Sequence, residues 1–287
     1  MKYVVLGGSS FYGKSFTQLL KDNGEEVVSL SRPTFDLSKD FRLPKSDIVV
    51  NFIAEGLVEE SWADPERWLM TNAVYTTRLF DDLKRLPNTL YVHVSTPEVY
   101  GSVSNWVAEN YPYNPSTPYA VSRACGDMML EAYHKAFGMK MIITRTANIY
   151  GWGQQDFRLI PKAFNYFSDK RPFPIHGQGY SMRSWIDVRD ACEGLYTVCK
   201  HGKVGDTYHI STTELKNVTE ILSNIGYIVG WQEYEWKPER LGKDKHYFLD
   251  STKLRALGWS DKITLKEGLN AYYAAFNERS KRVSVKA

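Results

Sequence analysis

The first half of the chain predicts an α/β fold built on a doubly wound parallel sheet. Three observations favour it. Short β-branched runs alternate with longer helical patterns, which is typical of βαβ units. The strand patterns are apolar on both faces, as expected of a sheet covered by helices on each side. A glycine-rich turn follows the first strand pattern and opens the first helix, an arrangement typical of a Rossmann-type domain.

The strand patterns that predict this sheet span Lys2–Leu6, Glu26–Leu30, Ile48–Ile53, Thr89–Ser95 and Lys140–Arg145. The helical patterns between them span Tyr12–Asn23, Pro65–Arg85 and Pro118–Phe137. After Arg145, glycines and prolines punctuate the chain and predict loops that build a site. A helix near Asp187–His201 and a strand at Thr207–Ser211 are expected to rejoin the main sheet. Three further helices are expected in a smaller lobe, at Asn217–Val229, Ser251–Leu257 and Thr264–Phe276.

Length and composition exclude several classes of protein. The 287 residues allow one large domain with a smaller lobe, and 43% hydrophobic with 24% charged residues excludes disorder as the main state. The formal net charge is only +3, so there is no electrostatic case for binding nucleic acid. No apolar run approaches the ~18 residues that cross a bilayer. Three cysteines and an N-terminus unlike a signal peptide predict a cytoplasmic protein.

The turn after the first strand predicts a dinucleotide site. Gly7 and Gly13 let the backbone approach a pyrophosphate, whose charge would lie at the N-terminus of the helix that Phe11 and Tyr12 open. Ser10 stands where a third glycine is usual. The alternative is an ordinary strand-to-helix turn, but its position at the start of a βαβ series favours dinucleotide binding.

The end of the second strand pattern bears on the choice between NAD and NADP. An acid that binds the ribose hydroxyls of NAD is usual there, but this chain has Ser31 and Arg32. A hydroxyl followed by a guanidinium suits a 2′-phosphate, so NADP is favoured over NAD. The alternative is an exposed arginine on a loop. Asp36 and Leu37 follow closely, where the adenine would lie.

Two segments predict a chemical centre. Thr96 and Glu98 follow the fourth strand pattern, at the sheet edge where open α/β proteins bind ligands. Tyr119 and Arg123 are four residues apart, and so share one face of the next helix. A tyrosine with a pKa of ~10 is a poor base, but a neighbouring cation and a positively charged nicotinamide would favour the phenolate. Thr96 could hold the same substrate hydroxyl.

The sequence resembles the extended short-chain dehydrogenase/reductase family, specifically its NAD(P)-dependent nucleotide-sugar epimerases and dehydratases. It is most similar to the dTDP-glucose 4,6-dehydratases, and the likeness runs from Lys2 to about Phe276. The matching motifs are Ala54-Glu55, Val58-Glu59, Ser61, Pro65, Thr71-Asn72, Ser-Thr-x-Glu-Val-Tyr-Gly at 95–101, Asn148-Ile149-Tyr150-Gly151, Leu159-Ile160-Pro161, Arg183-Ser184-Trp185, Asp250-Ser251-Thr252-Lys253 and Leu257-Gly258-Trp259.

This resemblance implies a division of the chain and of the roles. Residues 1–150 would form the dinucleotide-binding domain, and residues 151–287 mostly a nucleotide-sugar-binding lobe, with about 187–211 returning to the main sheet. The implied catalytic residues are Thr96, Glu98, Tyr119 and Arg123. Ala54, Tyr119 and Arg123 would also contact the dinucleotide. The implied substrate-binding residues are Glu55, Thr96, Asn148, Arg158 and Arg183.

The implied chemistry begins with transient oxidation at the 4-position of the sugar. Tyr119 would take the proton of the 4-hydroxyl, hydride would pass to the nicotinamide, and the resulting ketone would acidify the proton at the 5-position. Glu98 would remove that proton. The relatives are usually dimers, and the long helices at Pro65–Arg85 and Pro118–Phe137 could pair in a homodimer.

Two departures from the family pattern leave the net reaction open. Pro97 replaces the acid that protonates the departing 6-hydroxyl in the dehydratases, and Arg123 replaces the family lysine. Epimerisation, decarboxylation of a UDP-glucuronate-type substrate and NADPH-dependent reduction of a 4-keto sugar are alternatives, as is a protein that binds without turnover. No metal site is expected, since no further ligand completes a set with Cys192 and Cys199.

Overall fold

A six-stranded parallel sheet forms the centre of the molecule, in the order β2-β1-β3-β4-β5-β9. The computed structural model describes residues 1–239, 242, 244 and 246–284, with side chains up to residue 280. The strands of this sheet are β1 (Lys2–Leu6), β2 (Glu26–Leu30), β3 (Ile48–Asn51), β4 (Leu90–Ser95), β5 (Met141–Thr146) and β9 (Thr207–Ile210). Strand β9 pairs with β5, so a segment after residue 200 completes the main sheet.

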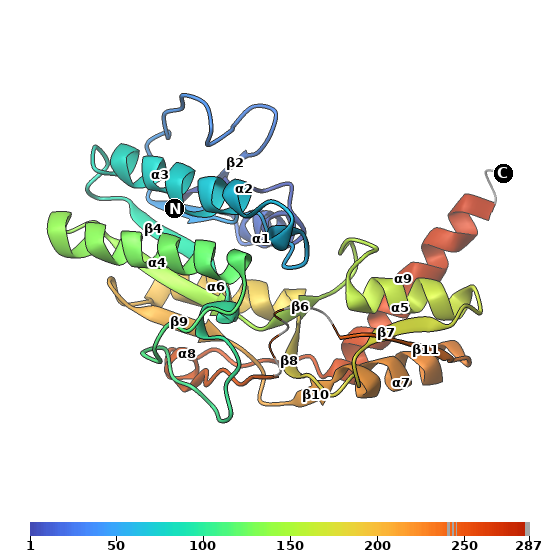
Figure 1. Cartoon of the computed structure of the whole chain (residues 1–287). Coiled ribbons are helices and arrows are strands. Elements are labelled where there is room, and N and C mark those ends of the chain that lie inside the picture. The colour runs from blue at the N-terminus through green and yellow to red at the C-terminus, as the bar shows by residue number, and fades with distance from the viewer. Residues whose placement is uncertain (240–241, 243, 245, 285–287) are drawn as a thin grey trace.

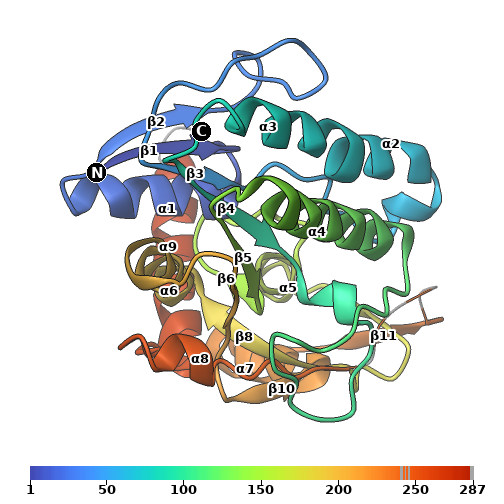
Figure 2. The same cartoon turned by 90° about the vertical axis from the view of Figure 1, so that its left-hand side faces the viewer.

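Helices cover both faces of this sheet, which confirms the predicted doubly wound fold (Figure 2). On one face lie α1 (Phe11–Asp22) and α6 (Val188–His201), and their apolar residues share a core with alternate residues of β1 and β3. On the other face lie α3 (Thr76–Leu83) and α4 (Pro118–Phe137), packed on the remaining strand residues. Each strand is therefore apolar on both sides because each side meets a helical layer.

The helical pattern at Pro65–Arg85 is one helical run with a wider turn at its centre. It consists of α2 (Pro65–Leu69), the π-helical η2 (Met70–Tyr75) and α3. Gly126 of α4 lies so close to η2 that a β-carbon there would be 2.6 Å from the Asn72 carbonyl oxygen. The side chain of Asn72 holds both backbone polar groups of Glu55, at 2.9 and 3.0 Å. The π turn thus fixes the loop that follows β3.

A smaller lobe packs beside the main sheet (Figure 1). Its core lies between the helices α5 (Leu159–Ser168), α7 (Val218–Val229) and α9 (Leu265–Ser284). The remaining strands form two small sheets, and they are β6 (Asn148–Tyr150), β7 (Phe173–His176), β8 (Met182–Asp187), β10 (Leu215–Asn217), β11 (Tyr234–Lys237) and β12 (His246–Tyr247).

The prediction of mainly loops between Arg145 and residue 187 is wrong, because α5 and the three short strands β6, β7 and β8 lie there. Glycine and proline misled the prediction at identifiable places. Pro161 is in the first turn of α5, where amide groups lack an intrahelical partner in any case. Pro174 lies in β7, which belongs to a two-stranded sheet. One edge of such a strand has no partner strand, so the missing N–H of proline is tolerated there.

The assignment of a helix at Ser251–Leu257 to the smaller lobe is also wrong. The short helix α8 (Thr252–Arg255) packs against β9 and α6. Leu254 and Trp259 belong to the core of the main sheet, where they are at most 5% exposed. Two short 3₁₀ turns complete the elements, η1 (Glu60–Trp62) and η3 (Pro97–Tyr100). None of the helices in the described residues is long and apolar enough to span a membrane.

Candidate active site

A cavity of about 440 Å³ lies at the carboxyl edge of the main sheet, between the sheet and the smaller lobe. Residues at the N-terminal ends of α1, α4 and α5 line it. The residues predicted to act in catalysis or binding that line this cavity are Ser10, Phe11, Tyr12, Thr96, Glu98, Tyr119, Arg123, Ala54, Asn148 and Arg158. The structure therefore gathers residues from six separate segments of the sequence.

The turn between β1 and α1 forms a tight cradle at one end of the cavity. Gly7 has a φ of +77°, and a β-carbon on Gly13 would lie 2.5 Å from the Gly7 carbonyl oxygen, so both positions require glycine. Ser10 is the N-cap of α1. Its hydroxyl donates to the Gly7 carbonyl at 2.7 Å and accepts from the Gly13 amide at 3.2 Å. The serine side chain is thus folded into the turn, which fits a dinucleotide pyrophosphate at the helix N-terminus.

The segment after β2 lies outside the cavity lining. Ser31 is half-buried and Arg32 is exposed, and the Ser31 carbonyl accepts from the Thr34 hydroxyl at 2.9 Å. Asp36 accepts two hydrogen bonds from Ser38, which hold the pKa of the Asp36 carboxyl below its usual range. The Leu37 side chain is only 3% exposed and packs in the core under α3, so only its backbone can face a ligand.

Thr96 and Glu98 are held in the 3₁₀ turn that follows β4. Thr96 is the N-cap of η3, and its hydroxyl oxygen accepts from the Glu98 amide at 3.4 Å. Pro97 is buried at the first position of the turn, where its fixed φ favours the conformation and its missing N–H costs nothing. Pro97 therefore shapes the turn that carries Thr96 and Glu98.

Glu98 is the carboxyl group best suited to act as a base near neutral pH. Its pKa is raised to about 7, mainly by burial; Arg183 lowers the pKa and Asp244 raises it, and both effects are smaller than that of burial. Its Oε2 atom is buried and has no hydrogen-bond partner among the described residues. A carboxyl group that lines a cavity, lacks a partner and titrates near pH 7 is typical of general acid–base catalysis.

Tyr119 and Arg123 project from the first turns of α4 into the same cavity. The Tyr119 phenol hydrogen-bonds to the Thr96 side chain. Burial and the nearby Glu98 carboxylate raise the pKa of Tyr119, and together they outweigh the lowering effect of Arg123. Arg123 thus favours the phenolate, as expected of a neighbouring cation, but in the chain alone burial disfavours the charged phenol by more.

The Arg123 guanidinium is directed toward strand β4. One Nη atom donates to the Val94 carbonyl oxygen and lies 3.4 Å from Nε2 of His93. Burial lowers the pKa of His93 to about 3, so this imidazole is neutral and can accept a hydrogen bond. Arg123 is only 3% exposed. It supplies a fixed positive charge at the base of the cavity.

Two of the predicted substrate-binding residues, Glu55 and Arg183, do not line the cavity. Their side chains bind other residues of the chain. Glu55 accepts two hydrogen bonds from Arg67, at 2.9 and 3.2 Å. Arg183 donates to the Asp244 carbonyl oxygen at 2.7 Å, and its guanidinium lies 4.4 Å from the centre of the Tyr247 ring. Arg183 nevertheless influences Glu98 electrostatically.

Sequence reasoning missed several residues of the cavity wall. They are Phe52, Gly56, Val58, Thr146, Gln154, Gln155 and Trp185, together with apolar neighbours. The two glutamines follow the glycines at 151 and 153, a polar pair in a glycine-rich loop, and this signal could have found them. Trp185 is part of a matching motif, but nothing in the sequence shows that β8 runs beside β6 and so places Trp185 at the cavity.

The fold and the cavity together define a dinucleotide-dependent enzyme of the short-chain dehydrogenase/reductase type. Residues 3–211 match the model of the NAD dependent epimerase/dehydratase family. The chain belongs to this family.

The proteins similar to this chain include dehydratases and an epimerase. The dTDP-glucose 4,6-dehydratase of Streptomyces niveus is 32% identical, over 94% of this chain and 90% of its own length. A low-salt glycan biosynthesis protein of Haloferax volcanii is 31% identical, over 97% and 100%. The crystal structure of a dTDP-glucose 4,6-dehydratase from Streptomyces venezuelae with NAD bound has a TM-score of 0.89, 28% identity and 97% coverage of both chains. A UDP-glucuronic acid 4-epimerase from Bacillus cereus, at 23% identity, shares the fold with a TM-score of 0.92.

Proposed function

We propose that this enzyme modifies a nucleotide-linked hexose through transient oxidation at the 4-position, with Glu98 as the base at the 5-position. The observation that carries the proposal is one cavity that holds Thr96, Glu98 and Tyr119 beside the cradle at the start of α1. A protein that only binds would not need a hydroxyl, a phenol and a carboxyl with a pKa of about 7 in one place.

Ser10 and the glycines at 7 and 13 would hold the pyrophosphate of the dinucleotide, with Phe11, Tyr12 and Ala54 beside it. The bound dinucleotide supplies a hydride acceptor and donor. Arg123 contributes a buried positive charge that would stabilise a phenolate or an oxyanion nearby. NADP is proposed over NAD, since Arg32 is exposed and could bind a 2′-phosphate.

The proton transfers fall to three side chains. Thr96 would orient the 4-hydroxyl, and the Tyr119 phenolate would accept its proton as the hydride leaves. The ketone then acidifies the neighbouring C5–H bond, and the ionised Glu98 would take that proton. Asn148 and Arg158 line the cavity wall toward α5 and would bind the diphosphate. Arg183 and Glu55 would act through the residues that they bind.

Incubation with UDP-, dTDP-, GDP- and CDP-sugars, followed by mass analysis, tests this proposal. Loss of water would identify a dehydratase, loss of carbon dioxide a decarboxylase, and unchanged mass with a new stereoisomer an epimerase. A strict requirement for added NADPH with a 4-keto sugar would identify a reductase. No turnover of any of these substrates, with intact dinucleotide binding, would favour a protein that binds without catalysis.

We also propose a division of labour along the chain and a homodimer. Residues 1–150 would bind the dinucleotide, and most of 151–287 the nucleotide sugar, with 187–211 in the main sheet.

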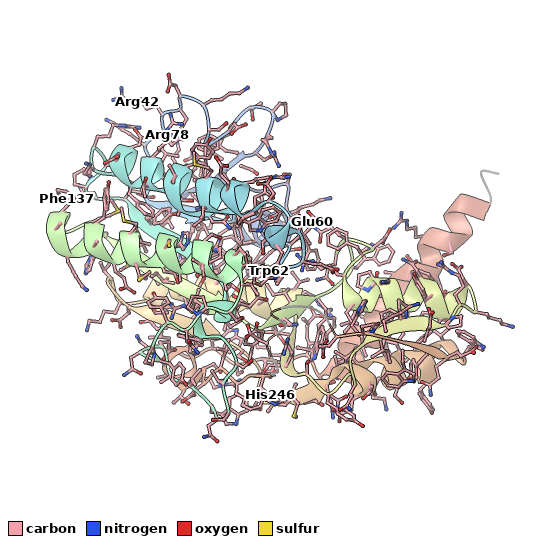
Figure 3. All side chains as sticks on the ribbon, viewed as in Figure 1. Arg42, Glu60, Trp62, Arg78, Phe137 and His246 are labelled. Carbon is pink, nitrogen blue, oxygen red and sulfur yellow. The ribbon has the colours of Figure 1, made fainter. Side chains whose placement is uncertain are left out.

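The homodimer would form through one exposed apolar face. Neighbouring helices α2, η2 and α4 expose Leu69, Val74, Val121, Met128, Met129 and Phe137. Phe137 stands at the end of α4 in Figure 3. Analytical ultracentrifugation of Met128→Asp should show a monomer if this face joins two copies.

The cellular location is proposed from the thiols. All three cysteines are free, and two of them are buried. This is expected of a protein that works in a reducing compartment such as the cytoplasm.

A further inference from the structure

The segment from Ser95 to Tyr100, which carries Thr96 and Glu98 and is called the catalytic turn below, is attached at both ends to one buried ion pair. Asp127 of α4 and Arg145 of β5 are at most 2% exposed, and an Arg145 Nη atom lies 2.9 Å from Asp127 Oδ2. Neither residue lines the cavity, and the chemistry proposed above uses neither of them. A buried ion pair is expensive to desolvate, so its presence calls for an explanation other than stability alone.

The first attachment is at Ser95, the residue before Thr96. The Ser95 hydroxyl donates to Asp127 Oδ2 at 2.8 Å, so the same carboxylate oxygen binds both the serine and the Arg145 guanidinium. Because Ser95 ends β4, this bond fixes where the chain leaves the sheet.

The second attachment is at Tyr100, the last residue of η3. Arg145 donates to the Tyr100 hydroxyl oxygen and its guanidinium lies 4.7 Å from the centre of the Tyr100 ring. His209 Nδ1 faces the Asp250 carbonyl at 3.0 Å and must donate to it, so Nε2 can accept a hydrogen bond from the Tyr100 hydroxyl at 2.8 Å. The Glu109 carbonyl lies farther from this hydroxyl, at 3.2 Å. The phenol is therefore fixed from two sides.

Only four residues separate the two attachments, and they include Thr96 and Glu98. We propose that Asp127 and Arg145 are positioning residues, which hold the catalytic turn through Ser95 and Tyr100 and thereby aim Thr96 and Glu98 at the substrate. The proposal deepens the proposed function, on which its kinetic test rests. A displacement of about 1 Å in such groups is enough to cost roughly 100-fold in rate.

Two conservative variants cut the attachments without leaving a buried charge unpaired. Ser95→Ala removes the bond to Asp127, and Tyr100→Phe removes the bonds to Arg145 and His209. Tyr113→Phe is the matched control, because the Tyr113 hydroxyl also binds Arg145, at 2.7 Å, and its ring also lies against the guanidinium, but Tyr113 is outside the turn. Each of the three variants loses one hydroxyl contact with the same ion pair.

The expected result is a fall in kcat of roughly tenfold or more for Ser95→Ala and Tyr100→Phe. The KM for substrate and dinucleotide should stay unchanged, and Tyr113→Phe should keep its kcat while losing a similar amount of thermal stability. If the three variants lose stability and kcat in equal proportion, the ion pair is merely structural and the proposal is overturned.

A second readout keeps this test separate from the test of the proposed function. Hydrogen exchange of the peptide containing residues 94–101 should be faster in Ser95→Ala and Tyr100→Phe than in the wild type or Tyr113→Phe. Unchanged exchange in both variants would overturn the positioning role even if the enzyme is active. If the wild type turns over no nucleotide sugar, the proposed function fails, while the exchange rates still decide whether the ion pair holds the turn.

Discussion

Two regions of the predicted dinucleotide site differ in how far the folded chain alone determines the position and charge of their side chains. At the end that lines the cavity, Tyr119 and Arg123 are buried, and burial raises the pKa of Tyr119 and of Glu98. At the ribose end, the segment from Ser31 to Leu37, Arg32 is exposed and the polar groups bind mainly each other.

This difference teaches where the fold can decide chemistry without a ligand. A buried group has its charge state set by the protein, so its role can be argued from the structure. An exposed arginine has no fixed position until a phosphate binds it, so the preference for NADP rests on residue type. The predictions below test the buried end first and the exposed end afterwards.

Tyr119→Phe has the largest expected effect. The substitution removes the phenol that is proposed to accept the substrate proton at the first step, so kcat should fall by roughly 1,000-fold. Steady-state kinetics on whichever nucleotide sugar is the substrate measures the loss. Tyr208→Phe is the control, since it removes another buried phenol, which accepts from the Lys203 amide and lies outside the cavity lining. Equal activity in Tyr119→Phe and the wild type would exclude the catalytic role.

Glu98→Gln should lower kcat by roughly 100-fold and change the pH profile. The pKa of Glu98 is raised to about 7, and a base must be ionised, so wild-type kcat/KM should fall as the pH drops below 7. The charges around Glu98 that set this value are Arg183, Asp244, Arg158 and Arg123. The variant should lack this acidic limb.

The same substitution has a predictable effect on stability. Because the folded-state pKa lies above the ordinary value of 4.5, folding favours the protonated carboxyl, and the ionised group destabilises the fold above pH 7. Glu98→Gln should therefore raise the thermal midpoint at pH 8, and the difference should shrink as the pH falls toward 4.5. A lower midpoint at pH 8 would show that the carboxylate is paired.

Arg32→Ala tests the exposed end. The KM for NADPH should rise by about tenfold while that for NADH is unchanged, because only the 2′-phosphate needs the guanidinium. Arg42→Ala makes the same change of charge at another exposed site of this region, visible in Figure 3, and should alter neither KM. If Arg32→Ala affects both dinucleotides alike, the chain does not discriminate through this residue.

Ser10→Ala has the smallest expected effect. Loss of the N-cap of α1 should lower the free energy of unfolding by about 1 kcal/mol, and Ser10→Gly by only a few tenths. Urea unfolding without dinucleotide measures both. An equal loss in the two variants would mean that the hydroxyl does not cap the helix.

The sequence was sufficient for the parallel sheet, its covering helices and the residues at the strand ends. Strand patterns such as Val4–Leu6 are apolar on both sides, and only a doubly covered sheet accommodates them. It was insufficient where side-chain partners decide the outcome. The bonds of Glu55 to Arg67 and of Arg183 to Asp244 join residues far apart in the chain, which no local pattern encodes.

The buried ion pair behind the catalytic turn is the clearest example of this limit. Asp127 reads as one more polar residue of a long helix, and Arg145 as the end of a strand. Their meaning depends on the pairing of β4 with β5 and on the packing of α4 over both.

The central claim is that this cavity oxidises the sugar at the 4-position and that Glu98 then removes the proton at the 5-position. Incubation of enzyme and substrate in D₂O, with the product examined by NMR or mass spectrometry, tests it most directly. The account predicts that the wild type introduces solvent deuterium at the 5-position and that Glu98→Gln does not. A productive wild-type reaction that leaves the 5-position free of deuterium would contradict it.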